Sequence, residues 1–156
     1  MFEVDIPGRG NLRLAHLVSD YNGTIAVDGK LIPELVPLIM SIAAMVEIHV
    51  VTADTFGLAQ ENLQVLPVKL TILPQDGQDQ KKLSYVHELG PGQTIAIGNG
   101  RNDKLMVRDA ALGIAIVEAE GACVETFQVA DIICRSPVDA LRLLLNPNRL
   151  IATLRA

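Results

Sequence analysis

The chain has 156 residues, of which 49% are hydrophobic and 3% aromatic, and its formal net charge is −5. A chain of this length buries about 68–70% of the surface that its unfolded form exposes, so we expect one domain over residues 1–156. The negative charge, without a basic stripe, argues against nucleic acid as a partner. The longest apolar stretch, Leu35 to Val46, is far shorter than the roughly 20 residues that span a bilayer, so no membrane segment is expected.

The residues available for a core are aliphatic, because the sequence contains no Trp and few other aromatic residues. Such a composition suits parallel strands that are covered by helices on both faces. Cys123 and Cys134 are the two cysteines, and no signal peptide is recognised. We therefore expect free thiols in a reducing, cytoplasmic compartment.

Two glycine-containing turns join β-runs near the start of the chain. The turns are Gly8-Arg9-Gly10 and Asp28-Gly29, and the second is a strong signal for a two-residue hairpin. The flanking runs are Phe2 to Ile6, Leu12 to Ser19, Thr24 to Val27 and Lys30 to Ile32. We expect two hairpins, one on each side of Asp20.

From Pro33 onward, helical and strand patterns alternate. The predicted helices cover 33–45, 56–62, 79–89 and 102–109, followed by a helical tail that starts near Ser136 and is broken at Pro147. The predicted strands cover 47–52, 68–73, 93–97, 112–117 and 131–134. Alternation with short links favours right-handed crossovers and a parallel sheet. The sequence therefore predicts an α/β fold, a three-layer α/β/α sandwich around a mostly parallel, Rossmann-like sheet.

Several polar residues lie at strand ends in this arrangement. Asp20 and Thr52 each end a β-run, and the strand 93–97 leads into the loop Gly98-Asn99-Gly100-Arg101-Asn102-Asp103. Because the carboxyl ends of parallel strands face one crevice, we expect these residues to meet. Alone, an Asp followed by Gly23 after a strand is equally typical of an ordinary turn. Together with the other strand ends, it predicts a carboxylate nucleophile beside a phosphate.

These segments, with Lys82 in a predicted helix, resemble the four motifs of the haloacid dehalogenase (HAD) superfamily of phosphotransferases. The loop 98–103 and the following segment 110–116 are similar to the hinge motif of P-type ion-pumping ATPases, so the chain resembles the soluble, P-type ATPase-like branch. The resemblance covers roughly residues 14–133. It implies that the 24–32 hairpin is the flap, and that there is no cap domain, because neither 20–52 nor 52–82 has room for one.

The resemblance also implies a Mg²⁺-dependent phosphatase that forms an aspartyl-phosphate on Asp20. The residues implied as catalytic are Asp20, Asn22, Thr52 and Lys82, and those implied for phosphate binding are Gly23, Thr52 and Lys82. The residues implied for Mg²⁺ are Asp20, Asn22 through its backbone carbonyl, Asn99 and Asp103. A hard cation is needed because a carboxylate must approach an anionic phosphate.

Two amides depart from the family pattern. Asn99 stands where the family has an acidic metal ligand, so weaker Mg²⁺ binding is expected. Asn22 stands where the phosphatases usually have an Asp that acts as general acid and base, and an amide can do neither. We therefore expect slow turnover.

The absence of a cap leaves the substrate open. An uncovered crevice implies a phosphorylated small molecule or phosphoprotein as partner, or a homo-oligomer whose second subunit supplies a lid, as in the capless octulosonate-phosphate phosphatases. One alternative is a catalytically weak homologue that senses phosphate or binds a partner. Another, a phosphoacceptor signalling domain, ranks last because its Asp would follow the third strand. His16, His49 and His87 lack metal-ligand spacing and are expected in packing or surface roles.

Overall fold

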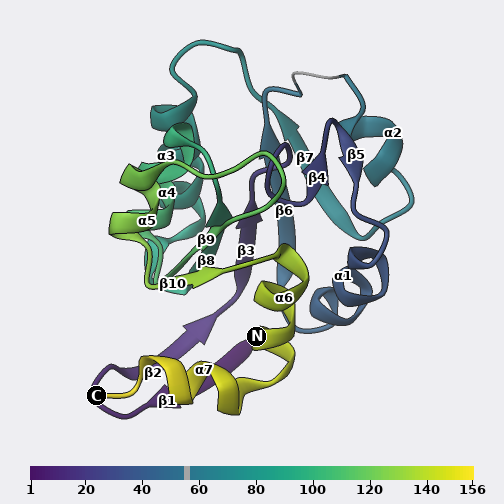
Figure 1. Cartoon of the computed structure of the whole chain (residues 1–156). Coiled ribbons are helices and arrows are strands. Elements are labelled where there is room, and N and C mark those ends of the chain that lie inside the picture. The colour runs from purple at the N-terminus through teal and green to yellow at the C-terminus, as the bar shows by residue number, and fades with distance from the viewer. Residues whose placement is uncertain (55–56) are drawn as a thin grey trace.

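The computed structural model describes residues 1–54 and 57–156, and within this part of the chain a six-stranded sheet forms the centre (Figure 1). The order is β10-β9-β8-β3-β6-β7, and every neighbouring pair is parallel. The strands are β3 (His16–Ser19), β6 (Glu47–Thr52), β7 (Val68–Ile72), β8 (Thr94–Gly98), β9 (Leu112–Ile116) and β10 (Ile132–Cys134). The predicted parallel sheet is confirmed.

Helices cover both faces of this sheet. On one face lie α1 (Leu35–Ala43) and α6 (Pro137–Leu145), and on the other lie α3 (Gln78–Leu89), α4 (Lys104–Asp109) and α5 (Val124–Val129). The short helix α2 (Ala59–Leu63) contacts β7, and α7 (Pro147–Leu154) packs against the N-terminal hairpin. The three-layer α/β/α sandwich without an inserted cap is thus confirmed for the described residues.

Side-chain alternation divides the core between these layers. On β3, Leu17 belongs to the cluster shared with α1 and α6, whereas Val18 belongs to the cluster shared with α3 and α4. All five residues of β8 and of β9 are buried. A strand whose side chains are apolar on both faces of the sheet needs helices packed on both faces. For this reason the aliphatic composition correctly predicts helices on each side of the sheet.

The expected strand Leu12 to Ser19 is divided in the structure. Its first part is β2 (Gly10–Leu14), which pairs antiparallel with β1 (Phe2–Ile6) in a separate hairpin, and its second part is β3. Ala15 lies between them, donating its backbone N–H to Gln93 O at 2.9 Å and accepting from Glu47 N at 2.9 Å. The chain changes hydrogen-bonding partners at this residue. The sequence from Leu12 to Ser19 carries no signal of that change.

The flap hairpin follows Asp20 as predicted. It consists of β4 (Ala26–Val27) and β5 (Lys30–Leu31), which pair antiparallel. Asp28 and Gly29 have φ angles of 50° and 78°, the left-handed conformation that two-residue hairpin turns require. The flap therefore stands at the carboxyl edge of the sheet.

Other differences from the sequence-based expectations concern short segments. Helix α5 was not predicted, because it has six residues and its N-cap, Cys123, offers no side-chain cap. The predicted helix 102–109 begins with a 3₁₀ turn, η2 (Arg101–Asp103), and a second such turn, η1 (Pro91–Gln93), precedes β8. Phe56, at the expected start of the second helix, lies outside the described residues.

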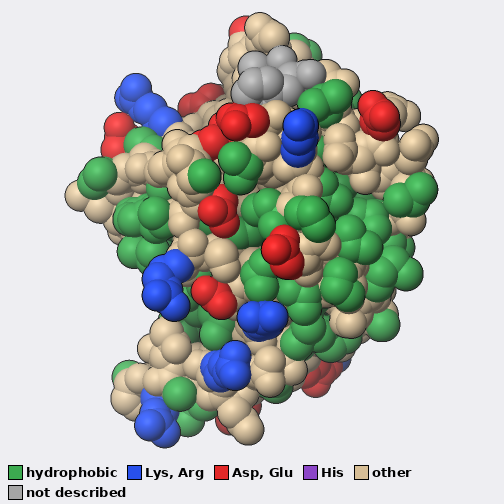
Figure 2. Space-filling view, turned by 45° about the vertical axis from the view of Figure 1, so that its right-hand side comes forward, with side chains coloured by type: hydrophobic (Ala, Val, Ile, Leu, Met, Phe, Trp, Pro, Cys, Tyr) green, Lys and Arg blue, Asp and Glu red, His purple; other side chains and the backbone are tan. Residues whose placement is uncertain are grey.

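Two expectations about the chain's surroundings can be compared with the structure. Both cysteines are free, with Cys134 buried and Cys123 partly so. The second expectation concerns membrane segments: none of the helices in the described ranges is long and apolar enough to cross a membrane. Figure 2, turned to bring the side of α1 forward, shows many hydrophobic side chains on that surface. Val36 and Met40 of α1 are exposed.

Gly113 in β9 permits the close packing of α4. A Cβ at this position would overlap the carbonyl oxygen of Val107 in α4. We predict that Gly113→Ala lowers the free energy of unfolding by roughly 1–3 kcal/mol, as expected for overpacking. Urea denaturation of the variant against wild type measures this. Gly92→Ala is the matched control, because its Cβ would meet no atom within 4 Å, and an equal loss in both variants would contradict the packing argument.

Candidate active site

Asp20 lies at the carboxyl end of β3, the strand between β8 and β6 in the sheet. Its backbone N–H donates to Ile97 O of β8 at 3.0 Å, which continues the ladder by one residue. The residue is 7% exposed, so its carboxylate reaches the surface from an otherwise buried position. This is the place that the sequence predicted for a nucleophile.

A buried lysine connects the two predicted carboxylates. Lys82 of α3 is fully buried, and its Nζ donates to Asp20 Oδ1 at 2.6 Å and to Asp103 Oδ1 at 2.6 Å. Its neighbour Lys81 does not reach these carboxylates, and Lys81 Nζ instead donates to Asp76 O. Three residues that are far apart in the sequence thus form one ion cluster.

The cluster carries two negative charges against one positive charge. Burial and the nearby charge of Asp103 raise the pKa of Asp20 to about 6, although Lys82 acts in the opposite direction. Burial by itself would lower the pKa of the Lys82 ammonium, but Asp103 and Asp20 together raise it above its usual value. Lys82 therefore stays protonated at neutral pH.

Asp103 has both carboxylate oxygens engaged. Oδ1 accepts from Lys82, and Oδ2 accepts from the backbone N–H groups of Asn99 at 3.0 Å and Gly100 at 2.9 Å. A Cβ on Gly98 would overlap the Asp103 side chain, so glycine is required for this approach. Asp103 holds both the lysine and the loop after β8, and it contributes negative field to the site.

Thr24, at the end of the first motif, lies between Asp20 and Asn99. Its Oγ1 is 3.3 Å from Asp20 Oδ2 and 3.1 Å from Asn99 Oδ1, and one hydroxyl proton can serve only one of them at a time. The amide Nδ2 of Asn99 donates to Gly121 O at 3.0 Å, which leaves Oδ1 on the side of Thr24 and Asp20. Two oxygen acceptors therefore converge there.

Asn22 adds a further unpaired oxygen. Its Oδ1 is buried and has no hydrogen-bond partner among the described residues. Oxygen atoms are the ligands that Mg²⁺ prefers, and the Asp20 carboxylate, the backbone carbonyl of Asn22 and the Asn99 amide offer them. The donor set at this edge of the sheet fits a hard divalent cation, although it carries less negative charge than the family pattern.

The remaining predicted residues lie at the same edge. Thr52 ends β6, is 2% exposed, and accepts the backbone N–H of Asp54 at 3.0 Å through Oγ1, which leaves its hydroxyl proton for another acceptor. Gly23 has a φ of 75°, and a Cβ there would overlap the Asn99 side chain. The structure does not bring Thr52 into hydrogen-bond contact with the Asp20 cluster.

Tyr21 has a role that the sequence reasoning missed. It is fully buried, and its Oη donates to Gly29 O at 3.0 Å, while its carbonyl accepts from Thr24, Ile25 and Ala26. Burial raises its pKa to about 12. Tyr21 therefore fixes the flap next to Asp20. The available sequence signal was an aromatic residue directly after Asp20, in a chain with few aromatic residues.

The three histidines, expected in packing or surface positions, lie in two different places. His87 pairs with Asp109 on the surface, as expected, with His87 Nε2 at 2.8 Å from Asp109 Oδ2. His16 and His49, however, lie 3.2 Å apart at the opposite end of the sheet, next to Glu47. Linear spacing did not reveal this cluster because its members come from adjacent strands.

The fold is similar to that of solved phosphatase structures. The 3-deoxy-D-manno-octulosonate 8-phosphate phosphatase from Moraxella catarrhalis, in complex with magnesium, phosphate and KDO, matches with a TM-score of 0.71 and 18% identity over 91% of this chain and 94% of that one. The cobalt-bound deoxy-D-mannose-octulosonate 8-phosphate phosphatase (YrbI) from Haemophilus influenzae matches with a TM-score of 0.71 and 13% identity over 92% of this chain and 94% of that one. A HAD superfamily (subfamily III A) hydrolase from Legionella pneumophila gives 0.68 and 15% over 90% and 87%.

Sequence comparison gives a nearer relative. No family model matches the chain. The uncharacterized protein MJ0073 of Methanocaldococcus jannaschii is 52% identical over 78 residues, which covers 47% of this chain and 84% of that protein. The chain therefore belongs to the same sequence family as MJ0073, and it has the fold of the HAD superfamily phosphatases.

Proposed function

We propose that the protein is a Mg²⁺-dependent phosphohydrolase that acts through an aspartyl-phosphate on Asp20. The observation that carries this proposal is the buried Lys82, whose ammonium bridges Asp20 and Asp103 at 2.6 Å each. A lysine held in this way orients one carboxylate at the carboxyl edge of a parallel sheet and neutralises part of an incoming phosphate. Likeness of fold to phosphatases supports the same reading.

The two oxygens of Asp20 have different surroundings. Oδ1 contacts Lys82, whereas Oδ2 lies with Thr24 on the side of Asn99. We assign the attack to Oδ1: its bond to phosphorus forms as the bond from phosphorus to the leaving oxygen breaks. Water then attacks the acyl phosphate, which releases inorganic phosphate and restores the carboxylate. The free hydroxyl proton of Thr52 and the ammonium of Lys82 bind the phosphoryl oxygens.

Asp20, Asn22 and Asn99 would hold Mg²⁺, with Asp103 contributing through its charge. The ion, when bound, cancels the repulsion between the nucleophile and an anionic phosphate. Because Asn99 and Asn22 are neutral, we expect weaker binding than a site with further carboxylates would give.

The absence of an inserted cap bears on the choice of substrate and partner. The described residues contain no inserted cap over Asp20, so we propose a phosphorylated small molecule or a phosphoprotein as substrate, with a second subunit as the candidate lid. The free state of Cys123 and Cys134 supports a reducing, cytoplasmic setting.

A second candidate function is a phosphate-sensing or partner-binding module. The observation that favours it is Asn22, a residue that cannot transfer protons, whose Oδ1 is buried without a partner. Hydrolysis of 4-nitrophenyl phosphate with Mg²⁺ separates the two: measurable turnover that depends on Asp20 supports the enzyme, and phosphate binding without turnover supports the module.

We predict that Asp20→Asn abolishes hydrolysis without lowering stability. The nucleophile is lost, but the isosteric amide removes one of two carboxylates that share a single buried ammonium, so the electrostatic balance improves. Turnover of 4-nitrophenyl phosphate and urea denaturation measure the two effects. Asp28→Asn, on the exposed flap turn, is the matched control and should retain activity. Normal turnover in Asp20→Asn would refute the proposed mechanism.

We predict that Lys82→Met, unlike Asp20→Asn, lowers the free energy of unfolding. It leaves two buried carboxylates facing each other without a counter-ion, for which a cost of about 3–5 kcal/mol is expected. If Lys82→Met were as stable as Asp20→Asn, the ion cluster would not have the electrostatic balance described above.

We predict that Asn99→Asp makes stability depend more strongly on Mg²⁺. The substitution removes the donor to Gly121 O and adds a negative charge near Asp20 and Asp103, so the melting temperature should fall in EDTA. Mg²⁺ should then raise it by more than in wild type, because the new carboxylate binds the ion. Asn146→Asp is the control, since Asn146 Nδ2 also donates to a backbone carbonyl but lies far from the site in sequence. Equal Mg²⁺ responses in all three proteins would show that residue 99 is not a ligand.

We predict that turnover depends steeply on the leaving group. Without a carboxylate at position 22, the enzyme lacks a proton donor and a base, each typically contributing about 10²–10⁴-fold to rate. Aryl and acyl phosphates should therefore react faster than alkyl phosphates, and Asn22→Asp should raise turnover and reduce this preference. Comparing kcat/KM for aryl and sugar phosphates in both proteins tests this. Similar rates for both substrates in wild type would mean that another residue supplies the proton.

A further inference from the structure

Three side chains with metal-binding atoms converge at the amino-terminal end of β3 and β6. His16 and Glu47 are partners in the β3–β6 register, and His49 follows Glu47 by two residues, so it lies on the same face of the sheet. One ligand atom from each residue lies within 4.8 Å of the others. The cluster is built on two central strands, which fix its geometry.

The distances between these atoms suit a single ion. His49 Nε2 is 3.0 Å from Glu47 Oε1, His16 Nδ1 is 3.2 Å from His49 Nε2, and His16 Nδ1 is 4.0 Å from Glu47 Oε1. Ligands of a tetrahedral zinc ion, bound at about 2.0–2.1 Å, lie about 3.3 Å from one another. One ion could bind all three atoms with small side-chain movements.

Tyr85 holds one of the rings in the orientation that metal binding needs. His49 is 2% exposed, and its Nδ1 lies 2.9 Å from Tyr85 Oη of α3. When Nδ1–H donates to the phenol oxygen, the lone pair of Nε2 points toward Glu47 and His16. Such outer hydrogen bonds are typical of histidine metal ligands.

His49 Nε2 faces both Glu47 Oε1 and His16 Nδ1. With the His49 proton on Nδ1, toward Tyr85, the lone pair of Nε2 faces the carboxylate oxygen with no proton of its own ring between them. A cation at this point would bind these lone pairs and that of His16 Nδ1.

We propose that His16, Glu47 and His49 bind one divalent transition metal of the zinc class, with a further position open to water. Two imidazoles and one carboxylate favour such borderline metals over Mg²⁺. The four residues from His16 to Asp20 place this site about 13 Å from the nucleophile, at the other end of the same strand. The proposal is independent of the proposed phosphatase activity.

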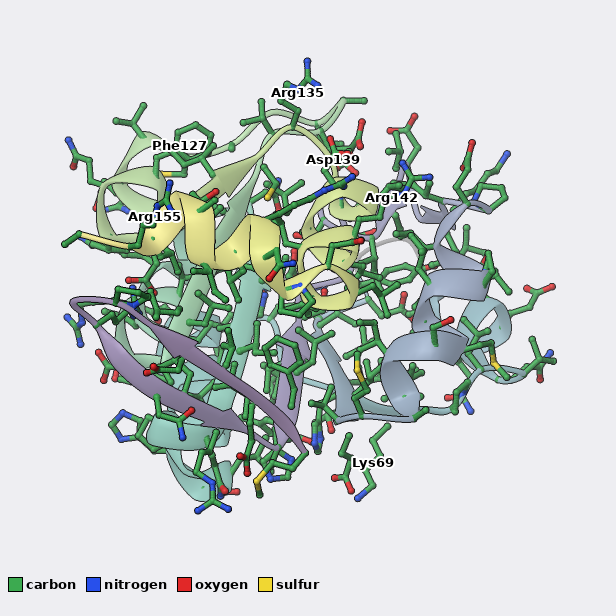
Figure 3. The ribbon with its side chains drawn as sticks, turned by 90° about the horizontal axis from the view of Figure 1, so that it is seen from below. Lys69, Phe127, Arg135, Asp139, Arg142 and Arg155 are labelled. Carbon is green, nitrogen blue, oxygen red and sulfur yellow. The ribbon has the colours of Figure 1, made fainter. Side chains whose placement is uncertain are left out.

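Lys69 competes with the metal for Glu47. Its Nζ lies 2.7 Å from Glu47 Oε1, the oxygen that faces the histidines, but its side chain is 64% exposed and can turn into solvent. Figure 3 views the molecule from this end and labels Lys69 there. A surface hollow of about 650 Å³, lined in part by Ala15, Glu47 and Lys69, gives an ion access from solvent.

The test is a Co²⁺ titration of the full chain, without a histidine tag, in the Asp20→Asn background so that the catalytic edge is impaired. We expect one equivalent of Co²⁺ to bind with visible absorption bands of a tetrahedral or five-coordinate ion, and Zn²⁺ to displace it. His16→Asn and Glu47→Gln, which alter partly exposed side chains, should each remove this signal, while His87→Asn, the control, should retain it. Circular dichroism checks that each variant is folded.

Two further variants separate this site from adventitious binding. Tyr85→Phe should weaken Zn²⁺ binding by about 10–100-fold, the usual effect of losing an outer hydrogen bond. Lys69→Met should tighten it, because the competing ammonium is gone. The proposal is overturned if Co²⁺ and Zn²⁺ do not bind, if binding persists in both His16→Asn and Glu47→Gln, or if neither Tyr85→Phe nor Lys69→Met changes the affinity.

Discussion

The buried contact of Lys82 with Asp20 and Asp103 is the interaction on which the arrangement of the carboxyl edge of the sheet depends. It connects the end of β3, the middle of α3 and the turn before α4 through one ammonium group. Since a buried charge without a partner is costly, each of these elements must be in place before the others are stable there. Asp103 transmits this constraint further, because its second oxygen fixes the backbone of the loop after β8.

The charge of the site follows from the same residues. One lysine and two aspartates sum to −1, and Asn22 and Asn99 add nothing. Carboxylates at both amide positions would bring the sum to −3 in the absence of metal. In the absence of metal, this site therefore has less repulsion between carboxylates than one with an Asp at both positions. Under the proposed function, weaker Mg²⁺ binding and slower proton transfer are the expected consequences.

The fold, and the gathering of polar residues at the carboxyl edge of the sheet, could be predicted from the sequence because both depend on local patterns. Apolar runs separated by helical segments specify a parallel sheet, and Asp20, Thr52 and Asp103 lie at strand ends or the turns after them. The division at Ala15 and helix α5 were missed because neither has a local signal. Contacts between separate segments were also not predictable from local patterns. The contact of His16 with Glu47 and His49 depends on the strand register, and those of Thr24 with Asn99 and Tyr21 with Gly29 depend on how the loops and the flap fold. The resemblance to P-type ATPases stays a prediction.

The shortness of β3 has a consequence for how this chain can vary. Its four residues have His16 at one end and lead to Asp20 at the other, and each end meets partners from β6 or from the loops beside β8. Inserting or deleting one residue would turn one end to the opposite face of the sheet. The strand is therefore a spacer of fixed length, and variation in chain length must be confined to the connections outside it.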